Sequence, residues 1–125
     1  MARAGLEQQF VRECRARLVE MKTDLLNRSR SAMREFENRE RGGGDEADMT
    51  MALLAENNFL TTQERAKERL LEIETAVARI DRGNYGVCEE TDEPIEIDRL
   101  RALPYTRLSI EGAELRESLQ KRYVR

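Results

Sequence analysis

The chain has 125 residues, a formal net charge of −3, two cysteines and no histidine. This length favours a single domain, and the absence of histidine excludes histidine-based catalytic triads and histidine-ligated metal sites. Two cysteines are too few for a four-thiolate zinc site and do not indicate a disulfide framework. The negative net charge argues against general nucleic-acid binding through a basic surface.

The sequence also lacks features of membrane or exported proteins. No stretch reaches the roughly 18 consecutive apolar residues of a membrane-spanning helix, and residues 1–10 contain no signal-peptide hydrophobic region. We therefore expect a cytoplasmic protein without membrane contact. Residues 1–44 carry ten Lys or Arg against seven Asp or Glu, and residues 45–125 carry twelve against eighteen. The resulting charges of +3 and −6 favour two helical segments that pack against each other.

The first predicted element is a long helix over residues 5–41. After Gly5 this segment has neither proline nor glycine, and its apolar residues recur mostly every three or four positions, with a longer gap around Arg28 and Ser29. This narrow stripe is typical of a coiled-coil seam. The stripe comprises Leu6, Phe10, Cys14, Leu18, Met21, Leu25, Ala32 or Met33, and Phe36. Three glycines at 42–44 then end the helix.

A second helix is predicted over about residues 46–82, with Asp45 or Asp48 as N-cap and Gly83 as C-cap. Asn57 and Gln63 fall near its apolar face, so we expect a partly polar seam near the tip. The predicted seam comprises Leu53, Leu60, Ala66, Leu70, Ile73, Val77 and Ile80. Two long amphipathic helices joined by a short connection predict an antiparallel coiled-coil hairpin with its tip at about residues 41–50.

The pattern changes at Gly83. Residues 84–88 and 94–98 read as two short strands around a polar turn, and they predict a small β-hairpin knuckle. One helical turn is expected at 99–103, before Pro104, and a final helix from the N-cap Ser109 to Arg122. The predicted fold is therefore mainly α, with a hairpin domain over residues 1–82 and a knuckle plus C-terminal helix over residues 83–125.

Few residues in this chain carry recognisable chemistry. Asp45 and Asp48 at the tip either cap the second helix, or are delivered by the stalk into a deep site where they meet a metal ion, a basic loop or a backbone donor. The acidic residues at 89–98 lack the spacing of a calcium loop, so we expect a solvated turn. Cys14 is expected to be a buried seam residue. Cys88 is expected to be buried or weakly reactive, with a pKa raised by the adjacent glutamates.

Three stretches of the knuckle and the last helix resemble the DksA/TraR family. They are Asn84-Tyr85-Gly86-Val87-Cys88-Glu89-Glu90-Thr91, then Ile95-x-Ile97-x-Arg99-Leu100-x-Ala102-x-Pro104, and Leu108-Ser109-Ile110-Glu111-Gly112. The resemblance implies a bacterial transcription factor that binds RNA polymerase directly. Such a factor inserts a coiled-coil hairpin through the secondary channel toward the active site, and it does not bind DNA sequence-specifically.

The resemblance also assigns residues. The family's tip motif Asp-x-x-Asp-x-Ala matches Asp45 and Asp48, with Thr50 in place of the alanine. The family's four zinc-binding cysteines correspond to Cys88, Thr91, Ser109 and Gly112. One thiolate cannot form a structural zinc site, so we expect a zinc-free knuckle without cofactor that folds by packing. The apolar residues available for this packing are Ile95, Ile97, Leu100, Leu103, Tyr105, Leu108 and Ile110.

Regulation by guanosine tetraphosphate is not expected at the family's shared site. The positions that are basic in responsive members correspond to Glu72, Leu103 and Ala113, and a glutamate repels phosphate. Arg65 matches a basic position on the second helix. It is either a contact to the polymerase rim or an exposed arginine paired with a nearby glutamate.

These observations predict a monomeric, non-enzymatic regulator that binds RNA polymerase and modulates initiation. Three alternatives remain open. The first is a transcript-cleavage factor in which the tip carboxylates hold a second Mg²⁺. The second is a coiled-coil adaptor with no polymerase role. The third is a polymerase binder whose tip is blunted, because Thr50 departs from the family motif.

Overall fold

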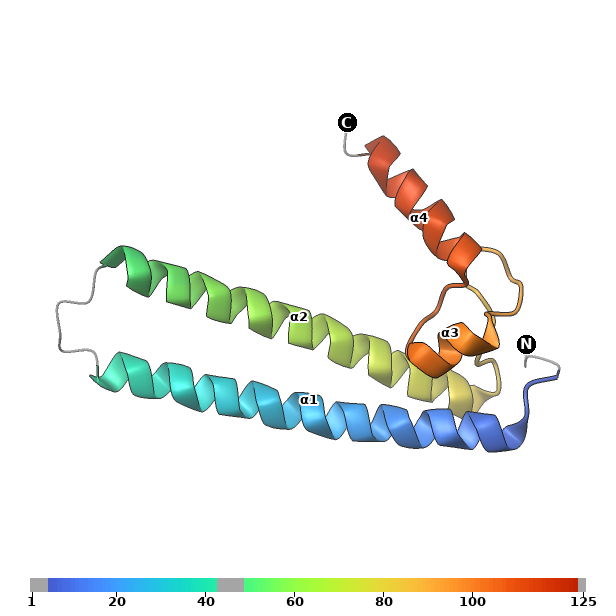
Figure 1. Ribbon diagram of the computed structural model, residues 1–125, viewed down its shortest axis with the longest axis horizontal. Coiled ribbons are helices and arrows are strands. Elements are labelled where there is room, and N and C mark those ends of the chain that lie inside the picture. The colour runs from blue at the N-terminus through green and yellow to red at the C-terminus, as the bar shows by residue number, and fades with distance from the viewer. Residues whose placement is uncertain (1–4, 43–48, 124–125) are drawn as a thin grey trace. The chain divides into compact units, whose positions relative to one another are not determined.

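The computed structural model describes residues 5–42 and 49–123 of the chain. Its elements are α1 (Gln8–Gly42), α2 (Met49–Arg82), α3 (Ile97–Ala102) and α4 (Ile110–Tyr123) (Figure 1). The predicted mainly α fold, with two long helices forming a coiled-coil hairpin, is confirmed. No helix in the described part of the chain is long and apolar enough to cross a membrane. The chain forms two compact units, residues 21–71 and residues 1–20 together with 72–125.

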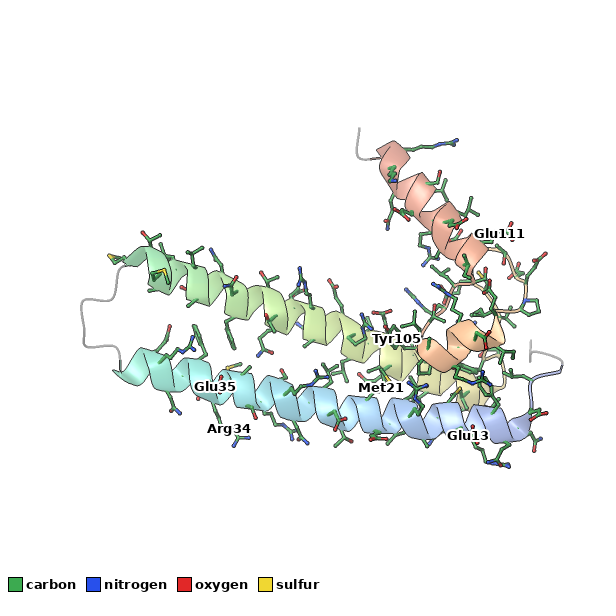
Figure 2. The ribbon with its side chains drawn as sticks, in the orientation of Figure 1. Glu13, Met21, Arg34, Glu35, Tyr105 and Glu111 are labelled. Carbon is green, nitrogen blue, oxygen red and sulfur yellow. The ribbon has the colours of Figure 1, made fainter. Side chains whose placement is uncertain are left out.

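The unit of residues 21–71 is an antiparallel pair of helical segments from α1 and α2. Phe36 stacks on Phe59, with ring centroids 4.2 Å apart and ring planes 3° from parallel. Ser29 fills the predicted gap in the seam, and its hydroxyl donates to Gln63 Oε1 at 2.6 Å. The Gln63 amide donates to the backbone carbonyl of Ser29 at 3.3 Å. Figure 2 shows Arg34 pointing away from α2, as expected for the charged outer face of α1.

The predicted seam of α2 is wrong at its first two positions. Leu53 and Leu60 are 57% and 56% exposed, whereas Phe59 faces α1 in their place. From Phe59 onward the seam advances in alternating steps of four and three residues, which is the spacing of a heptad repeat. The seam positions are Phe59, Gln63, Ala66, Leu70, Ile73, Val77 and Ile80. The aromatic stack sets the rotation of α2 and leaves the two leucines on an outer face.

The second unit joins the base of the two long helices to the knuckle around one core. Tyr85 lies in this core, and its hydroxyl donates to the carbonyl of Pro104 at 2.7 Å. The guanidinium of Arg101 lies 5.6 Å from the centre of the Phe10 ring. The buried apolar residues are Cys14, Leu18, Ile73, Ala76, Tyr85, Cys88, Ile95 and Leu100. The predicted division between residues 1–82 and 83–125 stays a prediction.

Helix α2 ends at the predicted glycine. Gly83 has a φ of +82°, which is favourable for glycine because it has no Cβ. The N–H of Gly83 donates to the carbonyl of Ile80 at 3.1 Å, and the N–H of Asn84 donates to the carbonyl of Arg79 at 3.0 Å. This pair of bonds is a Schellman motif, which satisfies the last carbonyls of the helix and turns the chain into the knuckle.

The predicted β-hairpin is reduced to one antiparallel bridge between Val87 and Pro94 in the part of the chain that the structure describes. The N–H of Cys88 donates to the carbonyl of Glu93, and the N–H of Ile95 donates to that of Gly86, both at 2.8 Å. Proline has no N–H to extend the ladder. Ile97, which was expected in the second strand, instead begins α3.

Candidate functional site

The four positions that correspond to the family's zinc ligands meet in the knuckle. Cys88 is fully buried and Ser109 is 6% exposed. The Ser109 hydroxyl accepts the N–H of Gly112 at 3.0 Å, so this serine is the predicted N-cap of α4. Gly112 lies directly against Cys88, because a Cβ at position 112 would overlap the Cys88 sulfur. Thr91 completes the group through hydrogen bonds to the thiol.

The two thiols of the chain have different environments. Burial raises the pKa of Cys88, but hydrogen bonds from the side chains and backbone of Ser109 and Thr91 outweigh burial and lower the pKa to about 7. The expectation of a raised pKa for Cys88 is therefore wrong. Burial raises the pKa of Cys14, although a hydrogen bond with Tyr85 partly offsets this effect.

We expect the ultraviolet absorbance of thiolate to show one transition near neutral pH and no second transition until well above it. Cys88→Ser should remove the first transition, whereas Cys14→Ser should retain it. Because the folded pKa of Cys88 lies below its ordinary value of 9.0, the thiolate stabilises the fold. This stabilisation is complete above pH 9 and is lost as the pH falls to about 7. A first transition that survives Cys88→Ser would contradict the assignment.

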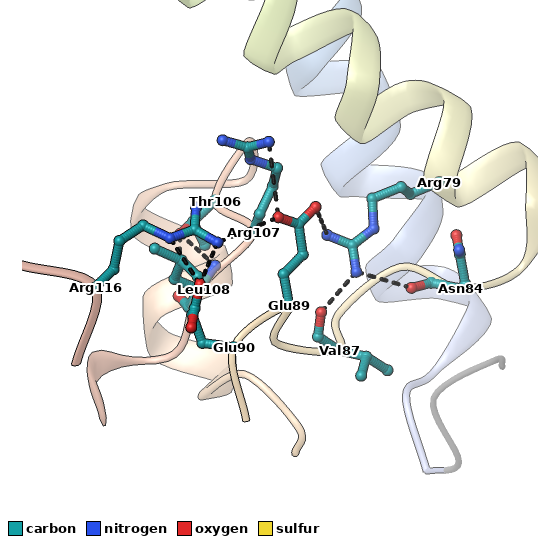
Figure 3. A network of polar contacts seen from close by, with 9 residues as sticks. All are labelled: Arg79, Asn84, Val87, Glu89, Glu90, Thr106, Arg107, Leu108 and Arg116. Atoms are coloured by element: carbon teal, nitrogen blue, oxygen red, sulfur yellow. Dashed lines mark hydrogen bonds and ion pairs between the residues drawn. The ribbon is translucent and has the colours of Figure 1, made fainter. Parts of the chain in front are cut away.

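Two glutamates of the 89–93 turn form an ion-pair network with three arginines from different elements (Figure 3). Glu89 lies 3.8 Å from Arg79 on α2, 3.7 Å from Arg107 in the loop before α4, and 3.7 Å from Arg116 on α4. Glu90 Oε1 accepts two hydrogen bonds from Arg116, at 2.6 and 2.9 Å. The network thus connects the end of α2, the turn and the last helix.

This network was missed by the sequence analysis, which expected a solvated turn. Arg79 is only 13% exposed at its side chain and also donates to the carbonyl of Val87 at 2.6 Å. Farther along, the carboxylate of Glu96 accepts the N–H of Ile110 at 3.2 Å, at the start of α4. Local sequence does not reveal the partners of these acidic residues, because Arg116 lies 26 positions after Glu90 and 27 after Glu89.

The structure describes only one of the three predicted tip residues. Asp45 and Asp48 lie outside the described residues, so their assignment stays a prediction. Thr50 is exposed in the first turn of α2. Arg65 is exposed farther along α2 and has no ion pair among the residues that the structure describes. The alternative of an arginine paired with a nearby glutamate is therefore not supported within that range.

Three positions of this chain correspond to the basic residues that bind guanosine tetraphosphate in responsive family members, and none of the three is basic here. Glu72, Leu103 and Ala113 are half-buried. No group of three or more Cys, Asp or Glu side chains able to hold a metal ion occurs within residues 5–42 and 49–123.

Sequence comparisons identify the family. The sequence model of the family described as "Prokaryotic dksA/traR C4-type zinc finger" matches residues 83–117. The RNA polymerase-binding transcription factor DksA of Caulobacter vibrioides is 30% identical over 105 residues, which cover 84% of this chain and 74% of that protein. The chain belongs to the DksA/TraR family. The DksA/TraR relative is described as a transcription factor, which agrees with the expectation of a non-enzyme.

Other relatives extend the comparison. The structure of transcription factor DksA2 from Pseudomonas aeruginosa covers 94% of this chain and 91% of its own, with 32% identity and a TM-score of 0.82. A Dks protein structure from Chlamydia trachomatis L2 has 20% identity and a TM-score of 0.57, and therefore supports the DksA/TraR fold alone. General stress protein 16O of Bacillus subtilis is 38% identical over 61 residues, or 48% of this chain.

The residues of this DksA/TraR member do not fit the zinc ion that the family description implies. A four-cysteine site needs four thiolates arranged around the metal. Here the four positions supply one thiol, two hydroxyls and a glycine without a side chain. The Cys88 sulfur also lies in the space that a fourth ligand would need at position 112. Hydrogen bonds to the thiol and the nearby ion pairs take the place of metal coordination.

Proposed function

We propose that this chain binds RNA polymerase directly and regulates transcription initiation. The observation that carries the proposal is the match to the Caulobacter polymerase-binding factor over 105 residues, which cover 84% of the chain. The DksA2 structure supports the same conclusion, because its fold agrees along 94% of the chain. Activity at RNA polymerase implies a cytoplasmic protein that acts without sequence-specific DNA contacts or a membrane, and we propose that the chain binds polymerase as a monomer.

The proposed mechanism is steric and electrostatic. Helix α1 has 35 residues, and at a rise of 1.5 Å per residue it is about 50 Å long. A stalk of this length has the reach to enter the secondary channel and bring Asp45, Asp48 and Thr50 near the active site. There the carboxylates act where the nucleic acid and the catalytic magnesium are handled, without any covalent step by this chain.

We assign contacts with the outer rim of polymerase to Arg65 and the last helix. Arg65 is exposed and has no ion pair within the described residues, so its charge is available to a partner. Helix α4 presents Ile110, Leu115 and Leu119 at 49%, 44% and 40% exposure. Exposed apolar side chains with polar residues around them are a feature of protein interaction surfaces, and the ion pairs of Glu89 and Glu90 with Arg116 hold this helix on the knuckle.

Alarmone independence is part of the proposal. A tetraphosphate ligand carries several negative charges and needs basic partners. The equivalent positions offer Glu72, Leu103 and Ala113, none of which is basic. The effect on initiation is therefore expected without guanosine tetraphosphate.

Replacing both tip carboxylates tests the role of the tip. In Asp45→Asn/Asp48→Asn the helices and knuckle stay intact, so polymerase binding should remain within a few-fold of the parent chain. The effect on initiation should fall at least about tenfold, which corresponds to ~1.4 kcal/mol. The measurements are polymerase affinity by titration and transcript yield from a ribosomal-type promoter, with Asp24→Asn, on the exposed side of α1, as the matched control.

The remaining outcomes separate the alternatives. Binding and transcription effects that both survive in the double variant would show that the carboxylates are not the effectors. Cleavage of backtracked transcripts by the parent chain would instead favour the transcript-cleavage factor. A complete lack of polymerase binding by the parent chain would favour the adaptor.

A further inference from the structure

A row of exposed residues lies on α2 beside the coiled-coil seam. It consists of Leu60, Glu64, Lys67 and Leu71, which we call the outer stripe. Successive members are four, three and four residues apart, a spacing that places them on one helical face. Leu60 is 56% exposed and Leu71 is 67% exposed, and the two charged residues between them are exposed as well. All four lie in the unit of residues 21–71.

The outer stripe borders a groove between the two helices. The groove has a volume of about 310 Å³. Leu26 of α1 lines it opposite Leu60, Glu64 and Lys67 of α2. Met33, one heptad after Leu26 on the same face of α1, is 42% exposed. Both helices therefore present apolar side chains on the side of the hairpin where the groove opens, and another helix with an apolar face can pack there.

The order of residues in the outer stripe is self-complementary. Read from either end, an exposed leucine is followed by one charge, then by the opposite charge, and then by a second leucine. Neither Glu64 nor Lys67 has an ion pair among the residues that the structure describes. A two-fold axis that crosses α2 midway between these two residues would bring Glu64 of each copy beside Lys67 of the other. The same axis brings Leu60 of each copy beside Leu71 of the other.

We propose that two copies of this chain associate in an antiparallel manner through the outer stripe. The interface then contains two contacts between Leu60 and Leu71 and two charge pairs between Glu64 and Lys67, related by the symmetry axis as in an isologous interface. The bulky side chain of Leu71 from one copy packs at the Leu60 end of the groove of the other. Because few side chains take part, the interface is at the small end of the specific range, and we expect a Kd on the order of tens of micromolar.

The outer stripe lies on a different face of α2 from the residue that we assign to the polymerase rim. Arg65, the residue we assign to the polymerase rim, is about 100° around α2 from Glu64, so the two faces are separate. A partner of unrelated sequence has no reason to match the order leucine, acid, base, leucine, whereas a second copy satisfies it by symmetry. The pairing does not depend on the polymerase assignment, and its failure leaves that assignment unchanged.

Sedimentation of the full chain over a concentration series that spans the expected Kd tests the pairing. The expected result is a reversible rise in mean mass from one chain to two. Leu60→Glu and Leu71→Glu should each weaken association by at least roughly tenfold, because they place a carboxylate against an apolar side chain. Leu54→Glu is the matched control. It changes a leucine with 52% exposure that lies off the stripe, and it should associate like the parent.

Exchange of the charges tests the register directly. Glu64→Lys and Lys67→Glu should each weaken association, because like charges then meet across the axis. The double variant Glu64→Lys/Lys67→Glu restores opposite charges and should return to the affinity of the parent. Circular dichroism of each variant establishes that the helices remain folded.

Several results would overturn the proposal. They are a chain that stays monomeric throughout the series, a dimer that survives Leu60→Glu and Leu71→Glu, and a double charge exchange that fails to restore pairing. Leucine variants that lose polymerase binding in a chain that never dimerises would assign the stripe to polymerase instead.

Discussion

Gly112→Ala is expected to lower the free energy of unfolding by about 1–3 kcal/mol, the usual cost of overpacking a buried site. In most helices this substitution is stabilising, because alanine is better than glycine by ~1 kcal/mol. Here the new Cβ would overlap the sulfur of Cys88, which is fully buried. Urea denaturation followed by circular dichroism gives the measurement.

Removal of the sulfur should reverse the sign of this effect. In a Cys88→Ala background the overlap disappears, and Gly112→Ala should then be neutral or stabilising. Ser118→Ala, at an exposed position of the same helix, controls for general effects on α4 and should change stability by less than about 0.5 kcal/mol. If Gly112→Ala stabilises the parent chain, the close approach of Cys88 to position 112 is wrong.

Leu100→Ala should cost more, about 2–5 kcal/mol, because Leu100 is completely buried in the core of the knuckle. In this account the stability of the knuckle comes from side-chain packing and not from a bound zinc ion, so a cavity in its core lowers that stability directly. Thermal unfolding of the variant should therefore be independent of added zinc or chelator.

Leu115→Ala is the matched control for this substitution, since it removes the same side chain from a position that is 44% exposed. Its expected cost is below about 1 kcal/mol. Recovery of the stability of Leu100→Ala on addition of zinc would show that a metal site does form in the knuckle.

The long helices were predictable because their signal is repeated many times. Heptad spacing over Cys14, Leu18, Met21 and Leu25 identifies one face of α1 even where Ser29 interrupts it. The rotation of α2 near the tip was not predictable in the same way. Leu53 and Leu60 are more hydrophobic than Gln63, and only the stack of Phe36 on Phe59 shows which of the competing faces is inside.

The knuckle was harder to predict for a different reason. Its contacts join residues far apart in sequence, such as Glu90 with Arg116 and Tyr85 with Pro104. Local patterns therefore predicted two strands where only one bridge forms within the described residues. They also predicted that Ile110 packs in the knuckle, whereas its side chain is 49% exposed. The grouping of Cys88, Thr91, Ser109 and Gly112 came from the family resemblance and not from local periodicity.

Transcription from a ribosomal-type promoter by purified polymerase, with chelator-treated protein and with or without guanosine tetraphosphate, tests the central claim most directly. We predict that the chain changes transcript yield to the same extent in all conditions, because we propose a mechanism that uses neither zinc nor the alarmone. No effect on polymerase, or an effect that appears only with added zinc or alarmone, would contradict the account.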